Sequence, residues 1–385
     1  MTAGSNEEIS LKRERLLGLM ARHGLDGAVL TSLAGIAWFT GGADLHVAWN
    51  TSEAVGALLV TGDRLCVVTG ASETARLKEE ELAGSPVEVI ERPWHEPVAD
   101  RVEQLAGAAR LGTDDRELAA EVLGAVFLGP EIAGLRHVLT PWEVDRYREV
   151  GRLTGASIED AARAIVPEMT EWQVAAMLDK ALLERGVEPT VTLIAADDRI
   201  RRFRHPIPTD NRIERCCMLI TCARKYGLIA AATRIVHFGP LPGDLRRRHQ
   251  ATVEVEAAAI ASSRPGATMG ELYDVIASAY AASGYPGEER LHHQGGAIGY
   301  ENREYLAAPG SSATIHAPQA FAWNPTVTGT KSEDTYLVLG SDARQACAGG
   351  GAPHVECLTA GDGSWPVIEV TRGGLVLRRP DILVL

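Results

Sequence analysis

The sequence predicts two domains, an α/β domain followed by an α+β domain. The chain has 385 residues, and single domains usually contain about 100 to 200. In the first part, short apolar segments alternate with helical patterns, which is typical of α/β structure. The second part has pairs of helical segments followed by strands. We therefore expect an N-terminal domain over residues 1–138 and a C-terminal domain over residues 139–385.

The N-terminal domain begins with a predicted helix over residues 7–23, where apolar side chains have helical spacing and Gly24 follows as a common helix stop. Gly62 and Asp63 predict a tight turn between two strands. Strands are expected at residues 28–31, 54–60, 65–68 and 87–90, and helices near 75–82 and 97–108.

Thr140, Pro141 and Glu143 predict the helix that opens the C-terminal domain. Threonine is a preferred N-cap, proline suits the first helical position, and an acid in the first turn complements the helix dipole. The expected elements are helices over 141–164 and 170–185, strands between 191 and 238, helices over 243–263 and 269–282, and strands to the end of the chain.

The composition excludes two classes of partner. The net charge of −13 opposes binding to nucleic acid or anionic lipid. No stretch approaches the roughly 18 to 20 apolar residues of a membrane span. Residues 1–13 are polar and acidic, unlike a signal peptide. We expect a cytoplasmic protein with no nucleic-acid partner and no membrane association.

The six cysteines are too few and too scattered for a disulfide framework. Cys216, Cys217 and Cys222 are clustered, but they alternate with apolar residues in a predicted buried strand. Free cysteine there acts as a small hydrophobic residue. We favour core packing for this cluster over a metal or redox role.

Short motifs spaced along the chain indicate a family. They are GLDGAVL (24–30), IAWFTG (36–41), PWEVDRYR (141–148), MTEWQV (169–174), RPGATMGEL (264–272) and KSEDT (331–335). In this order they resemble members of the methionine aminopeptidase, prolidase and creatinase superfamily. The RPGATMGEL motif resembles that family's PG-x-T-x-x-E-L turn, and KSEDT resembles its R-x-E-D-T strand. The resemblance implies a creatinase-like N-terminal domain and a pita-bread catalytic domain.

The family's peptidases bind two divalent cations through two Asp, one His and two Glu. The resemblance assigns these positions to Ile220, Ala231, Gly296, Asn324 and Glu333. Only Glu333 offers a suitable carboxylate, and no Asp occurs anywhere between residues 211 and 240. One carboxylate is too few for a dinuclear site. We expect no metal and no other cofactor.

Two residues are the predicted catalytic groups. His205, in RHPIPTD, matches the histidine of the family's P-H-x-x-P-T-D loop, which metal-free creatinase uses as its acid/base. The alternative is a surface histidine in a basic loop. Glu333 would orient His205 or hold a substrate ammonium or guanidinium group. Alternatively, it is a former metal ligand that now pairs with Arg234 or Arg303.

Arg303 stands where the family has a second catalytic histidine, and it either clamps a substrate carboxylate or pairs with Glu304 or Glu301. Glu53 lies near the place where, in creatinase, an N-terminal loop reaches across the dimer to the substrate. The predicted substrate-binding residues are Arg303, Glu304, Asn324, Arg234 and Glu53.

His292 and His293, with His237 and His316, raise the question of a relocated metal site. Imidazoles without carboxylates at defined spacing are weak evidence for one, and adjacent residues on a strand point to opposite faces. We expect no such site.

The function hypothesis is a metal-independent, creatinase-like enzyme that acts at a carbon–nitrogen bond of a small amino-acid-like or amidine-like metabolite. His205 is its general acid/base, and the substrate belongs to a specialised pathway. Creatine itself is disfavoured, because Ala231, Thr233 and Asn324 offer no acid for a guanidinium group.

A homodimer is expected from the resemblance and because symmetric dimers are common. The alternative is a catalytically silent pita-bread module that binds a peptide or protein partner.

Overall fold

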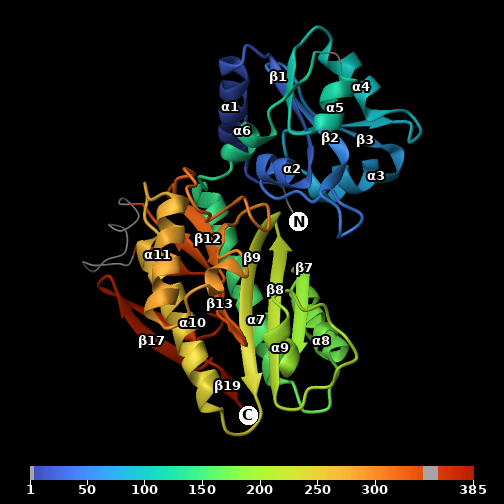
Figure 1. Cartoon of the computed structure of the whole chain (residues 1–385). Helices are drawn as coiled ribbons and strands as arrows, with labels where there is room; N and C mark the ends of the chain where they lie inside the picture. Colours follow the sequence, from blue (N-terminus) through green and yellow to red (C-terminus); the bar gives the residue numbers. More distant parts are fainter. Residues whose placement is uncertain (1–3, 123, 341–353) are drawn as a thin grey trace. The chain divides into compact units, whose positions relative to one another are not determined.

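The computed structural model describes residues 4–122, 124–340 and 354–385, which form two compact units (Figure 1). The first contains Met1–Glu143 and Tyr226–Leu228, and the second contains Val144–Lys225 and Ile229–Leu385. The division falls within the first turn of helix α7 (Pro141–Arg163), a few residues after the boundary expected from the sequence.

The N-terminal unit is an α/β domain built on a six-stranded sheet in the order β4-β3-β2-β1-β5-β6. Its elements are α1 (Asn6–Arg22), β1 (Gly27–Ser32), α2 (Leu33–Thr40), β2 (Glu53–Thr61), β3 (Leu65–Gly70), α3 (Ala71–Arg76), a π-helix η1 (Leu77–Glu81), β4 (Glu88–Arg92), α4 (Val98–Ala106), β5 (Leu111–Thr113), α5 (Arg116–Glu121), β6 (Val126–Phe127) and α6 (Gly129–Gly134).

The predicted hairpin in this sheet is confirmed. Strands β2 and β3 are antiparallel, with Val60 opposite Leu65. In the turn between them, the Thr61 hydroxyl donates to Asp63 Oδ1 at 2.8 Å, and the Arg64 N–H donates to Thr61 Oγ1 at 3.1 Å. Helix α4 covers one face of the sheet through Val102, which packs in the same core cluster as Val29, Leu59 and Val68.

The C-terminal unit is an α+β domain that contains a four-stranded and a five-stranded sheet, ordered β19-β9-β8-β7 and β11-β10-β12-β15-β16. Its helices are α7, α8 (Glu171–Leu183), α9 (Asp198–Arg202), α10 (Gly243–Ser262), α11 (Met269–Ala282) and a 3-10 turn η2 (Glu288–Arg290). Its strands are β7 (Glu188–Ala196), β8 (Cys216–Lys225), β9 (Leu228–His237), β10 (Gly295–Ala297), β11 (Tyr305–Leu306), β12 (Gln319–Trp323), β13 (Thr326–Val327), β14 (Thr330–Lys331), β15 (Asp334–Val338), β16 (Val355–Cys357), β17 (Val367–Arg372), β18 (Leu375–Pro380) and β19 (Leu383–Val384).

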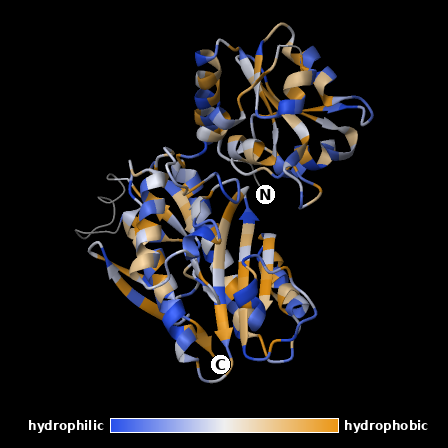
Figure 2. Ribbon diagram, in the orientation of Figure 1, coloured by the Kyte–Doolittle hydropathy of each residue, from blue (hydrophilic) through white to orange (hydrophobic). Residues whose placement is uncertain are grey.

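Both faces of strand β8 are apolar, and Figure 2 colours most of this strand as hydrophobic. Successive side chains of a strand point to opposite faces. Cys217 and Leu219 pack into the cluster that includes α7 and α8, whereas Met218 and Ile220 pack into a second cluster with residues of β7 and α9. Both faces of the sheet are therefore covered, as expected for a strand with continuous apolar character.

The cysteines of β8 are core residues, as the alternation predicted. Cys216, Cys217 and Cys222 are buried, and burial raises the pKa of the Cys216 and Cys222 thiols to about 12. Such thiols stay protonated near neutral pH and are poor nucleophiles. Cys347 lies outside the described residues.

The cap predicted at Thr140 is confirmed, because the Glu143 N–H donates to Thr140 Oγ1 at 3.2 Å, and two further helices begin in a similar way. Thr268 and Glu271 form a reciprocal capping box at the start of α11, and Thr170 and Gln173 form another at α8. Such boxes satisfy backbone N–H groups that the first helical turn leaves without partners. Within the part of the chain that the structure describes, no helix is both long enough and apolar enough to cross a membrane.

Candidate functional site

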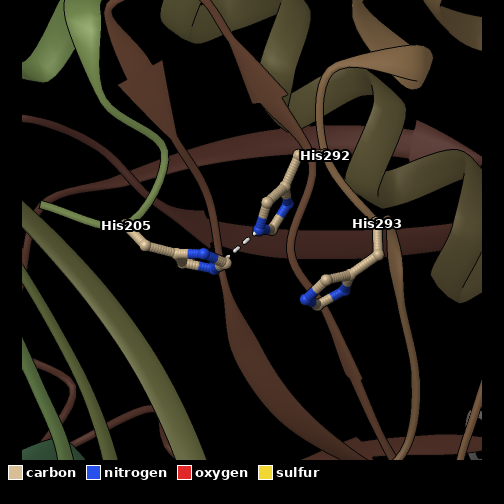
Figure 3. A group of neighbouring side chains, drawn as sticks. All are labelled: His205, His292 and His293. Carbon is tan, nitrogen blue, oxygen red and sulfur yellow. Dashed lines mark hydrogen bonds between the residues drawn. The ribbon is translucent and has the colours of Figure 1, made fainter.

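Three histidine rings of the C-terminal domain lie close together (Figure 3). His205 follows α9, whereas His292 and His293 lie between η2 and β10. The Nε2 atoms of His205 and His292 are 2.9 Å apart, and the rings of His292 and His293 stack with centroids 4.2 Å apart. One nitrogen from each ring lies within 4.8 Å of the other two. We call His205, His292 and His293 the histidine cluster.

The cluster corrects one step of the sequence reasoning. His292 and His293 do not lie on a strand, so the alternation expected of neighbouring strand residues does not apply to them. Both side chains instead point toward His205 (Figure 3). The other two histidines considered with them lie elsewhere: the His237 ring contacts the Gly239 carbonyl at 3.0 Å, and His316 is exposed.

An ion pair joins the two loops that carry the cluster. Arg204 Nη2 lies 2.6 Å from Glu288 Oε2 and donates to Thr328 Oγ1 at 2.9 Å. The Thr328 hydroxyl donates in turn to Glu288 Oε1 at 2.8 Å. Because Arg204 precedes His205 and Glu288 is in η2, this ion pair fixes His205 beside His292.

Glu171 holds the other end of the His205 loop. Its carboxylate pairs with Arg199 and accepts from the Thr209 hydroxyl at 2.7 Å. Arg199 also donates to the Ile207 carbonyl at 2.9 Å. The loop is thus held on both sides of His205 by side-chain bonds.

Gln294 positions the His292 backbone. Its Nε2 donates to the His292 carbonyl at 2.5 Å, and its Oε1 accepts from the Tyr280 hydroxyl at 2.8 Å. Tyr280 is buried on α11, so a core residue supports the loop. Because Gln294 is itself bonded to a core residue, the His292 backbone is held in one position.

A buried group of charges lies next to the cluster. Glu333 pairs with Lys331 at 3.2 Å and with Arg303 at 3.1 Å, and it accepts from the Thr233 hydroxyl at 2.9 Å. Burial opposes ionisation of Glu333, but Lys331 and Arg303 outweigh it, so the pKa of the carboxyl lies below its usual value. Burial also lowers the pKa of Lys331, against the attraction of Glu333. Glu333 is therefore ionised at neutral pH.

These charges and burial keep all three imidazoles neutral. Burial and the charge of Lys331 lower the pKa of His292 to about 2. Burial and the charges of Arg303 and Lys331 lower the pKa of His293 to about 4. Partial burial and Lys331 also lower the pKa of the more exposed His205, and Glu333 opposes them. Each ring therefore keeps one lone pair at pH 7.

Several buried polar atoms around the cluster lack a hydrogen-bond partner among the described residues. They are Nδ1 of His292, Nδ1 of His293, Nε of Arg303 and Oδ1 of Asn324. Asn324 adjoins the cluster because its N–H donates to the Gln294 carbonyl at 3.2 Å. Buried polar groups are nearly always paired, so these four atoms are available to water, an ion or a polar ligand.

Two other predicted site residues of this unit, Arg234 and Glu304, bind groups other than the cluster. Arg234 points from the face of β9 opposite Thr233 and pairs with Glu159 and Asp334, each at 3.0 Å, beside a separate cavity of about 310 Å³. Glu304 accepts from the backbone N–H groups of Tyr300 at 3.0 Å and Glu301 at 3.3 Å.

Glu53 is an exposed residue at the start of β2 in the other unit. The predicted residues that do gather at one place are His205, Glu333, Arg303 and Asn324.

Sequence reasoning missed Lys331 as a site residue and dismissed His292 and His293. Lys331 stands within the KSEDT motif, two residues before Glu333, which was the available signal for a buried ion pair. The adjacent histidines precede a glycine-rich segment at Gly295 and Gly296. This position directly before two glycines was the available signal that His292 and His293 lie in a loop, where the alternation of strand side chains does not apply.

Comparison with known proteins identifies the family. Residues 145–340 match the model of metallopeptidase family M24, and residues 12–126 match the creatinase/prolidase N-terminal domain. The chain belongs to metallopeptidase family M24. The resemblance inferred from the sequence motifs and the predicted fold class are both confirmed.

Individual relatives are distant. The chain is 22% identical over 349 residues to "Uncharacterized peptidase YqhT" of Bacillus subtilis, covering 85% of this chain and 95% of that protein. It is 29% identical over 177 residues to "Agropine synthesis cyclase" of Rhizobium rhizogenes, covering 40% and 43%. The X-Pro aminopeptidase structure from Thermotoga maritima superposes with a TM-score of 0.75 at 17% identity, covering 97% and 99%.

The residues at the positions assigned to the M24 metal ligands do not fit a two-metal centre. Ile220 and Ala231 are buried and apolar. A Cβ on Gly296 would lie 2.1 Å from the Tyr305 carbonyl oxygen, so an imidazole cannot stand there without a backbone shift. Asn324 offers a neutral amide, and Glu333 is already bound to two cations.

The lowered histidine pKa values predict acid sensitivity. A histidine whose folded pKa lies below its unfolded value of about 6.5 binds protons preferentially in the unfolded state. Stability is therefore fully present above pH 6.5 and falls as the pH drops toward 4, the folded pKa of His293. The slope is at most about 1.4 kcal/mol per pH unit for each group, and less for a half-buried ring screened by water.

Denaturant unfolding of wild type and of His293→Asn between pH 7.5 and 4.5 checks this prediction. The variant lacks one of the titrating rings, so its stability should fall less steeply with decreasing pH. Parallel pH profiles for the two proteins would show that His293 is not held neutral by the fold.

Proposed function

We propose that this M24 protein is a metal-independent, creatinase-like enzyme that acts at a carbon–nitrogen bond of a small amino-acid-like or amidine-like metabolite. His205 is the general acid/base. The observation that carries the proposal is the 2.9 Å contact between the Nε2 atoms of His205 and His292, with His205 exposed and His292 more deeply buried.

The contact assigns a role to each ring. If His205 Nε2–H donates to His292 Nε2, the lone pair of His205 is on Nδ1, the remaining nitrogen. His205 Nδ1 then takes a proton from water or from the substrate, and the resulting imidazolium still donates to His292. A base whose second nitrogen is hydrogen-bonded keeps one tautomer and one orientation. His292 suits the acceptor role because burial keeps it neutral.

The charges next to the cluster favour a substrate with a carboxylate. Lys331 and Arg303 carry two positive charges against the one negative charge of Glu333. The Arg303 Nε–H has no partner among the described residues and suits a carboxylate oxygen. The Asn324 Oδ1, also without a described partner, suits an amine or amide N–H. Both features fit an amino-acid-like molecule.

The aligned relatives are not all named as peptidases. Three are named as peptidases or a dipeptidase, and one, which aligns over 177 residues, is named a cyclase of agropine synthesis. The family fold therefore supports more than one reaction type, and the site has to decide among them. A site without a two-metal centre favours direct acid/base chemistry over attack by a metal-bound hydroxide.

We also propose that the protein is a homodimer. The loop before β2 in the N-terminal domain exposes two large apolar side chains, Val47 and Trp49, with 67% and 50% of their surface accessible. Neighbouring exposed apolar side chains of this kind are typical of an interaction surface. The resemblance implies that this loop corresponds to the creatinase loop that reaches across the dimer to the substrate.

Replacing His205 should remove most of the activity. The test first assays the wild type on a panel of amino-acid amides, N-substituted amino acids and amidines, and then compares His205→Ala in single turnover. Loss of a general acid/base costs about 10² to 10⁴ in rate. His316→Ala, which removes an exposed histidine of the same domain, is the matched control. The wild-type rate should rise with pH through a midpoint below 6.5, because the pKa of His205 is lowered.

A folded His205→Ala protein that retains most of its rate would show that the base lies elsewhere. A folded wild type that turns over nothing on the panel but binds a peptide would favour the silent module. Circular dichroism confirms folding in both cases.

The dimer proposal predicts twice the mass of one chain, about 82 kDa for a 41.2 kDa chain, in light scattering at micromolar concentration. Trp49→Ser should weaken the dimer, whereas Trp94→Ser, which removes another exposed tryptophan of the same domain, should leave it unchanged. A monomeric wild type would contradict the proposal.

A further inference from the structure

We propose that His205, His292 and His293 form a binding site for a single divalent transition-metal ion, and that the bound ion blocks the acid/base role of His205. Its three ligands differ from the residues that family resemblance assigns to the two-metal position, of which Glu333 and Asn324 lie beside the cluster. Its metal-binding part stands on the geometry alone, and the blocking effect rests on the proposed function.

The spacing of the nitrogens suits one ion. A tetrahedral Zn²⁺ site with Zn–N bonds of about 2.0 to 2.1 Å places its nitrogens roughly 3.4 Å apart. In the cluster, one nitrogen of each ring lies within 4.8 Å of the other two, and the His205–His292 pair is already at 2.9 Å. Side-chain rotations that bring the three nitrogens to this spacing would complete the arrangement.

The rings are also chemically ready for a metal. Metal binding requires neutral imidazoles, and all three rings have lowered pKa values. The Nδ1 atoms of His292 and His293 have no hydrogen-bond partner among the described residues. No described contact therefore fixes the tautomer of His293, and that ring can adopt the form that an ion requires.

The donor set selects the metal. Three imidazoles without a carboxylate favour Zn²⁺, Co²⁺, Ni²⁺ or Cu²⁺ over Mg²⁺, Ca²⁺ or Mn²⁺, which prefer oxygen ligands. Glu333 does not alter this preference, because its carboxylate is held by Lys331, Arg303 and Thr233.

The surrounding charges determine the fourth ligand. Arg204 is balanced by Glu288, but Lys331 and Arg303 exceed the charge of Glu333 by one. This excess lowers the affinity for a cation and favours an anion, such as hydroxide or a carboxylate, in the open position of the ion. We expect an affinity that depends on the anions present.

A bound ion and the acid/base reaction compete for the same atoms. In the proposed mechanism, Nε2 of His205 donates to Nε2 of His292, and this bond holds His205 in its working tautomer. An ion that takes those nitrogens removes the bond, and a neutral His205 bound through Nε2 carries its proton on Nδ1, so it has no lone pair left to act as a base. Metal should therefore inhibit turnover.

Titration of chelator-treated, tag-free protein with Co²⁺ tests the site without a substrate. We expect about one ion per chain, with the visible absorption typical of tetrahedral Co²⁺, and displacement by Zn²⁺. His293→Asn should bind at least about 100-fold more weakly, while His316→Asn should bind like wild type. Circular dichroism shows that each variant is folded.

Two binding results would overturn the site: no saturable Co²⁺ binding up to millimolar concentration, or equal binding by wild type and folded His293→Asn. Once a substrate is known, Zn²⁺ should inhibit wild type and should inhibit His293→Asn only at much higher concentration. A rise in turnover on binding Zn²⁺ would leave the site standing but overturn the blocking effect and the metal-independent mechanism. Loss of activity in His205→Ala tests the proposed function separately.

Discussion

Glu333 is a buried carboxylate whose charge is balanced by Lys331 at 3.2 Å and Arg303 at 3.1 Å. A charge without a partner in the interior is strongly destabilising, so these three side chains depend on one another. In a two-metal site, cations would balance the carboxylates. Here the side chains of Lys331 and Arg303 supply the positive charge at the Glu333 carboxylate. Burial is the main cause of the lowered pKa values of His292 and His293, Lys331 lowers both further, and Arg303 adds to the effect on His293.

The histidine cluster depends equally on the loops that carry it. The Arg204–Glu288 ion pair joins the two loops, and Gln294 fixes the backbone of His292 through Tyr280. Arg204 belongs to the RHPIPTD motif, whereas Glu288, Gln294 and Tyr280 lie outside the motifs that indicated the family. A pita-bread scaffold can thus present a different set of catalytic or ligand atoms while its strands and helices stay in place.

The sequence predicted elements with strong local signals. Helix α11 has the bounds expected from its pattern, because Thr268 and Glu271 cap it locally. His205 and Glu333 were found because each lies within a recognisable motif. The approach of His292 and His293 to His205 could not be predicted in the same way, because it depends on loop conformations and contacts between residues more than eighty positions apart. Thr233 contacts Glu333 and Arg234 contacts Asp334, because the two residues lie on opposite faces of β9. The sequence alone did not show which of these faces carries the site.

We propose that the side-chain cations of Lys331 and Arg303, and not metal ions, neutralise Glu333. Anomalous diffraction from crystals soaked in Mn²⁺ tests it most directly, because Mn²⁺ prefers oxygen ligands and scatters anomalously. We predict no anomalous peak within bonding distance of the Glu333 carboxylate, with Lys331 and Arg303 still paired to it. A single peak at the histidine cluster would leave this claim intact. Two peaks about 3.5 to 4 Å apart, with Glu333 as a ligand, would contradict it.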